Sequence, residues 1–173
     1  KIQANLIIYS RKRKHLWSFG DCQCIINGKL FSHEKKIDII LSNMRSLYLE
    51  LERICGKTEE ELIAHDTGRE FILPILEKAS LLENTKSEYD IVNLNGFEIE
   101  TDKLVKYYLL EGDEVVLASD GYPELKTTLK ESERKLAEIL DKDPLCYKNY
   151  LSTKGLKEGN ASFDDRTYIS FTV

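Results

Sequence analysis

Two short acidic turns beside apolar, strand-like runs hold the residues with the most informative chemistry. In the first, the run EVVLAS leads into Asp120 and Gly121, and in the second, Asp164 and Asp165 precede the run TYISFTV. Mg²⁺ and Mn²⁺ prefer oxygen ligands on a rigid scaffold, which carboxylates at strand ends provide. The acids are 44 positions apart (164 − 120), so only a folded sheet would bring them together. The pattern predicts a divalent-metal site at the strand ends.

A third acid occupies a similar place, because Asp21 follows Gly20 at another strand junction. Each turn is ordinary when taken alone, since Ser-Asp-Gly is a common turn and Asp-Asp often caps an element. Their combination favours a site, because three acids at strand junctions could meet at one end of a sheet. Gly121 would let the backbone approach a ligand closely or adopt positive φ.

These segments, in this order, resemble the metal-dependent serine/threonine protein phosphatases of type 2C and their bacterial relatives. The stretch WSFGDCQ (17–23) is similar to the family strand that ends in Gly-Asp, and DEVVLASDG (113–121) to its apolar run that closes on Ala-Ser-Asp-Gly. The stretch DDRTYISF resembles the family's Asp-Asn-x-Thr followed by a strand, with Asp165 in the place of Asn. The resemblance covers roughly the C-terminal two-thirds of a family domain, and its central motif is the most specific.

The resemblance implies an α+β fold in which an antiparallel β-sandwich is flanked by helices, in four layers ordered α-β-β-α. The whole chain, 1–173, would be a single, N-terminally incomplete domain with its helical layer at about 37–84. Two or more Mn²⁺ or Mg²⁺ ions would sit at one end of the sandwich and activate a water that attacks phosphorus.

The resemblance also implies a role for each acid. Asp120 and Asp164 would bind the same metal, and Asp21 would help to hold an additional, weaker one. Gly121, Asp165 and Thr167 would support the turns. No catalytic residue beyond the metal ligands is identified.

One part of the family pattern is not found in this sequence. The family's N-terminal portion carries an Asp-Gly-His-Gly-Gly-like turn and a phosphate-binding Arg, and nothing similar occurs here. Either an upstream segment completes the site, as the absence of an initiating Met suggests, or the chain is a shortened, noncatalytic relative.

Three functions follow. The leading one is metal-dependent hydrolysis of phosphoserine or phosphothreonine on a phosphoprotein substrate, provided that the N-terminal part is present. The second is a catalytically inactive phosphatase-like binding or regulatory module, with a protein partner on the helix pair or at the acidic site. The third is a plain interaction domain whose acidic turns are structural.

Composition agrees with a soluble globular chain: 42% of the 173 residues are apolar, 32% are charged, and the net charge is −5. The negative charge argues against a nucleic-acid partner. The sequence contains no run of ~18 apolar residues, so it predicts no membrane-spanning helix. The spacing of Cys22, Cys24, Cys55 and Cys146 does not fit a zinc site, so we expect reduced cysteines, with 22 and 24 buried, in a cytoplasmic setting. The basic cluster 11–15 is either a hairpin turn or a docking patch for an acidic partner.

The remaining pattern predicts the elements that position the acids. Four runs between residues 6 and 31 predict an antiparallel meander with a hairpin at Asn27-Gly28. Apolar steps of three and four predict a core-facing helix from 37 to about 54, ending at Gly56. A capping-box pattern at Thr58 begins a second helix to about Leu82, with a kink or break at Pro74.

Further strands are expected at 105–110, 114–119 and 167–173, and a helix at 129–140. The long loop that begins at Asp143 is typical of either a disordered segment or part of a site. His33 is either a polar residue near a helix start or a site residue, and His65 is expected on an exposed helix face.

Overall fold

The computed structural model describes residues 3–173, which form two compact units of an α+β chain. The first, which we call the sheet unit, comprises the described residues up to Lys35 together with Leu82–Glu133 and Arg166–Val173. The second, the helical unit, comprises Lys36–Leu81 and Arg134–Asp165. The acids of interest are divided between the units, because Asp21 and Asp120 belong to the first and Asp164 and Asp165 to the second.

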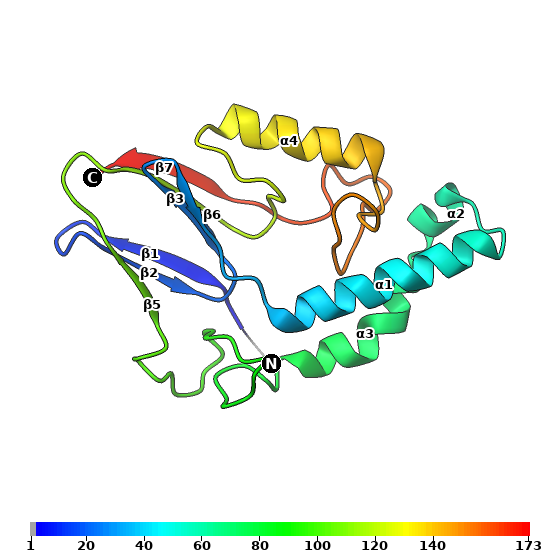
Figure 1. Cartoon of the computed structure of the whole chain (residues 1–173), viewed down its shortest axis with the longest axis horizontal. Coiled ribbons are helices and arrows are strands. Elements are labelled where there is room, and N and C mark those ends of the chain that lie inside the picture. The colour runs from blue at the N-terminus through cyan, green and yellow to red at the C-terminus, as the bar shows by residue number, and fades with distance from the viewer. Residues whose placement is uncertain (1–2) are drawn as a thin grey trace. The chain divides into compact units, whose positions relative to one another are not determined.

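The sheet unit contains a three-stranded antiparallel sheet in the order β1-β2-β5 (Figure 1). Its strands are β1 (Leu6–Ser10), β2 (His15–Phe19) and β5 (Val105–Tyr108). Residues 11–14 form the turn that joins β1 to β2, so the hairpin interpretation of the basic cluster is confirmed.

The second sheet of this unit has four antiparallel strands in the order β4-β3-β6-β7 (Figure 1). They are β3 (Gln23–Ile26), β4 (Lys29–Phe31), β6 (Glu114–Ala118) and β7 (Tyr168–Thr172). Asn27 and Gly28 make the predicted hairpin turn, with φ of 49° and 80°. The single predicted meander is wrong, because β2 and β3 lie in different sheets; Gly20, at φ 75°, sits in the turn where the chain leaves the first sheet.

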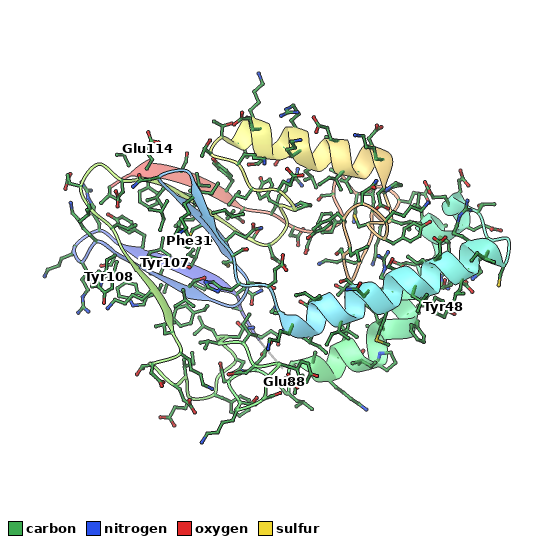
Figure 2. The ribbon with its side chains drawn as sticks, in the orientation of Figure 1. Phe31, Tyr48, Glu88, Tyr107, Tyr108 and Glu114 are labelled. Atoms are coloured by element: carbon green, nitrogen blue, oxygen red, sulfur yellow. The ribbon has the colours of Figure 1, made fainter. Side chains whose placement is uncertain are left out.

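Side chains of both sheets form one buried core. Leu16 from the three-stranded sheet clusters with Cys24, Val115 and Leu117 from the other, as the alternation along a strand requires. The rings of Phe31 and Tyr107 complete this contact from opposite sheets, with centroids 4.8 Å apart (Figure 2). Alternate residues of β6 point to the opposite face, where they pack with Tyr122 and Leu125.

Four helices complete the described chain: α1 (Lys36–Ile54), α2 (Glu59–Ala64), α3 (Thr67–Ala79) and α4 (Leu129–Lys142). The predicted extent of α1 and the capping box at Thr58 are confirmed. The break expected at Pro74 is wrong, because the chain breaks at residues 65–66 and Pro74 lies inside α3. Asp66 causes the break, since its side chain caps α3 by accepting from the Arg69 N–H at 2.8 Å.

The buried face of α1 differs from the apolar stripe predicted by the steps of three and four. That stripe comprises Ile37, Ile40, Leu41, Met44, Leu47, Tyr48, Leu51 and Ile54. Leu41, Arg45 and Leu49 are fully buried, whereas Leu47 and Ile54 are 63% and 74% exposed. α3 packs against α1, and Tyr48 stacks on Phe71 with centroids 4.6 Å apart. The expectation that the whole stripe packs in the core is therefore wrong for exposed positions such as Leu47 and Ile54.

The loop that follows α4 is ordered at its start by hydrogen bonds to Asp143. The buried Asp143 carboxylate accepts the backbone N–H groups of Tyr147, Lys148 and Asn149 at 2.7–3.2 Å. Three carbonyl groups of the same loop then accept hydrogen bonds from the Arg45 guanidinium, which fixes the loop to α1.

Outside the named strands, Ala4 and Leu94 form an isolated antiparallel bridge. Within residues 3–173, none of the helices combines the length and apolar character that a bilayer crossing requires.

Candidate functional site: the acidic turns at the strand ends

Asp120 lies just beyond the end of β6, with an exposed side chain next to the buried Gly121. The turn is held from both sides by neighbouring strands. Gln23 of β3 donates its side-chain N–H to the carbonyl groups of Tyr122 at 2.8 Å and Ser119 at 3.3 Å. On the other side Thr167 donates its backbone N–H to the Ser119 hydroxyl at 3.0 Å and accepts from the Ser119 N–H at 3.2 Å.

These bonds connect Thr167 to the turn after β6. The bonds of Gln23 explain why a polar residue lies among the buried residues of β3. Its side-chain amide donates hydrogen bonds to the carbonyl groups on both sides of the Asp120–Gly121 turn. Because the backbone on either side of Asp120 is fixed, the carboxylate is presented from a rigid turn, as a metal ligand must be.

Asp21 is built into the turn between the two sheets. Gly20 has φ 75°, and a Cβ atom there would collide with the side chain of Asn5, so glycine is required on both counts. Asn5 donates its side-chain N–H to Oδ1 of Asp21, and Lys35 Nζ lies 2.9 Å from Oδ2. The side chains of Lys35 and Asp21 are only 14% and 11% exposed.

Asp21 and Asp120 flank the same end of the β3–β6 strand pair, because Gln23 pairs with Ala118 and each acid lies two positions beyond one of these partners. The pKa of the buried Cys22 thiol is raised to about 11, mainly by burial and in addition by the charges of Asp21 and Asp120, while Lys35 opposes them. Two of the three predicted ligands thus act on the same sulfur atom. Burial likewise raises the pKa values of Cys24 and Cys146 to about 12, so none of the three buried thiols is a reactive nucleophile.

Glu133 links the segments that follow the two acidic turns. Its carboxylate accepts the Tyr122 hydroxyl at 2.7 Å and two N–H groups of Arg166, at 2.8 Å and 2.7 Å. The paired guanidinium lowers the pKa of Glu133, and burial together with this carboxylate raises that of Tyr122 to about 12. Tyr122 comes two residues after Asp120 and Arg166 one residue after Asp165, so one side chain anchors both segments.

Asp164 belongs to the helical unit and has its own partners there. Its Oδ1 atom lies 2.5 Å from Lys154 Nζ and accepts the Asp165 N–H at 2.8 Å. Asp165 is exposed. Asp164 therefore differs from Asp165 in being held by an ion pair.

The fit of these residues to a divalent metal differs from acid to acid. Asp120 fits, because it is an exposed carboxylate on a fixed turn. Asp21 does not fit a resident metal, because protein groups already occupy both of its oxygens. Among residues 3–173, there is no group of three or more His, Cys, Asp or Glu side chains arranged to hold a metal ion.

Sequence reasoning did not identify Lys35, Lys154, Gln23 or Glu133. Their partners are 10 to 99 positions away, so no local spacing signals them. Of the histidines, His33 Nε2 lies 2.9 Å from the Tyr107 hydroxyl, and burial lowers its pKa. His65 is exposed and pairs with Glu70, as expected of a surface residue.

No family model, curated protein or solved structure matches this chain.

Proposed function

We propose that this chain is the larger, C-terminal part of a type 2C-like phosphatase domain in a four-layer α-β-β-α arrangement, and that it serves metal-dependent hydrolysis of a phosphomonoester. The class of substrate is phosphoserine or phosphothreonine on a protein. The observation that carries the proposal is the exposed Asp120 carboxylate, which follows β6 on a turn that Gln23 and Thr167 hold in place.

Asp120 is the residue we assign to the metal. Gln23 and Thr167 hold its turn, and Glu133 anchors the segment that follows. A Mn²⁺ or Mg²⁺ ion held there supplies a Lewis acid for the phosphoryl oxygens and activates water for attack. The part of Asp164 in the same function rests on the resemblance of its motif.

The test is hydrolysis of a phosphothreonine peptide, in Mn²⁺ buffer and in chelator, by a domain that contains both this chain and the N-terminal part. We expect hydrolysis only with Mn²⁺, and a loss of more than about 100-fold in Asp120→Asn, because even outer partners of metal ligands cost about 10–100-fold. Asp102→Asn, which changes another exposed acid of the sheet unit, serves as the matched control and keeps full activity. Hydrolysis that persists in chelator, or equally in Asp120→Asn, would contradict the proposal.

A second candidate is the inactive phosphatase-like binding module. It is favoured by the ion pairs Lys35–Asp21 and Lys154–Asp164, in which an ammonium group engages two of the three predicted ligands. The exposed positions Leu47 and Ile54 of α1 offer this module a surface for a protein partner. Mn²⁺ binding without any hydrolysis would select this candidate over the first.

A further inference from the structure

The ion pair between Lys35 and Asp21 is unusual among those of the sheet unit in being almost excluded from water. Its N–O distance is 2.9 Å, and the two side chains are 14% and 11% exposed. The other pairs of this unit have at least one side chain that is 33% exposed or more. Exposed pairs contribute little, whereas a desolvated pair is strongly coupled, since neither charge can be left alone.

Both oxygen atoms of Asp21 have a protein donor. Oδ2 takes the ammonium of Lys35, and Oδ1 takes the side-chain amide of Asn5. A Mg²⁺ or Mn²⁺ ion needs the same lone pairs at about 2.0–2.2 Å, so it could bind Asp21 only after Lys35 had left. Gly20 fixes Asn5 in place, because the two residues are in direct contact.

The surrounding charge explains why a cation is needed at this point. Asp21 and Asp120 both act on the Cys22 thiol, and Lys35 acts on it with the opposite sign. Like charges near one another disfavour their ionised forms, and an ammonium group paired with Asp21 offsets that effect.

We propose that the ammonium group of Lys35 is the resident cation of Asp21 and takes the place of the additional metal ion there. The metal centre of the proposed function then includes Asp120 but not Asp21. Lys35 becomes the residue that limits the number of metal ions the chain binds. This inference rests on the proposed function for the meaning of the site, but its own test requires no catalysis.

The experiment is a calorimetric titration of the whole chain with Mn²⁺, comparing wild type with Lys35→Gln. We expect Lys35→Gln to bind one more Mn²⁺ ion per chain than wild type, because the freed Oδ2 becomes available. The gain is absent in the double variant Lys35→Gln/Asp21→Asn and in Lys35→Arg, which keeps the positive charge. Equal stoichiometry in wild type and Lys35→Gln would overturn the inference.

A second comparison covers the case in which Lys35→Gln fails to fold, as judged by circular dichroism. If Lys35 is the resident cation, Asp21→Asn binds as many Mn²⁺ ions as wild type. Loss of one ion in Asp21→Asn would show that Asp21 holds a metal and would overturn the inference. Failure of the proposed function appears differently: wild type then binds no Mn²⁺, whereas a gain in Lys35→Gln still supports the role of Lys35.

Discussion

Among the described residues, each unit holds one ion pair with both side chains largely buried, and the two pairs differ in their surroundings. In the helical unit, Arg45 is fully buried and uses all its N–H groups, on Asp66 and on the carbonyl groups of Leu145, Cys146 and Ser152. In the sheet unit, Lys35 and Asp21 both act electrostatically on the Cys22 thiol, as does a further acid, Asp120.

The difference separates a structural ion pair from one in a candidate site. A guanidinium whose donors are all satisfied by the fold has nothing left for a ligand, so we assign Arg45 to stability. The sheet unit instead presents the carboxylate of Asp120 in an exposed position after β6. Chemistry is therefore expected at the sheet unit and rigidity at the helical one.

The largest expected effect on stability is that of Arg45→Met. Removing the guanidinium leaves Asp66 and three carbonyl groups without their donor, and breaking such a buried pair costs about 3–5 kcal/mol. Urea unfolding followed by circular dichroism at the helical signal measures this loss. Arg53→Met, an exposed arginine of the same helix, is the control, with a change within about 0.5 kcal/mol. Equal effects of the two variants would remove the distinction between the units.

The sole tryptophan sharpens this prediction, because Trp17 lies in β2 of the sheet unit. Its fluorescence follows the sheet unit while circular dichroism follows the helices. In Arg45→Met we expect the helical transition to shift to lower urea more than the fluorescence transition does.

A smaller effect is expected from Asp143→Asn, which tests the loop that Arg45 holds. The variant removes the charge that accepts three backbone N–H groups, and hydrogen bonds to charged groups contribute about 1.5–3 kcal/mol. Asp141→Asn is the matched control, because Asp141 is exposed two positions earlier. If both variants unfold at the same urea concentration, the Asp143 carboxylate does not organise the loop.

The two units also show which parts of the fold could be predicted from the sequence. The strands, the α1 boundaries and the capping box at Thr58 follow from local pattern, and each was predicted. Burial of Arg45 could not be predicted, because an arginine among apolar positions is normally a solvated neighbour, and its acceptors lie 21 to 107 positions away. The break before α3 depends on Asp66, whose dual role as cap and Arg45 partner exists only in the folded chain.

For the candidate site, the sequence pointed to the acids but not to the groups that surround them. Asp21, Asp120 and Asp164 were identified from their places beside apolar runs. The lysines that engage two of them were not, since such pairing depends on tertiary structure. Asp21 is the clearest case, because its motif suggests a metal ligand and its surroundings supply an ammonium group instead.

The smallest expected effect is a pH dependence at Cys22. The folded-state pKa of its thiol is about 11, above the ordinary value of 9.0. A raised pKa stabilises the fold below pH 9, and this contribution is lost as pH rises from 9 towards 11. The free energy of unfolding between pH 8 and 11 should therefore fall less steeply in Cys22→Ala than in wild type. Parallel pH profiles would mean that the thiol is not shielded beside Asp21 and Asp120.

The most direct test of the metal assignment is a calorimetric Mn²⁺ titration of wild type, Asp120→Asn and Asp102→Asn. We predict that wild type and Asp102→Asn bind Mn²⁺ alike, and that Asp120→Asn loses most of the affinity because one charged ligand of a small oxygen site is gone. Equal Mn²⁺ binding by wild type and Asp120→Asn would contradict the assignment of the metal to the turn after β6.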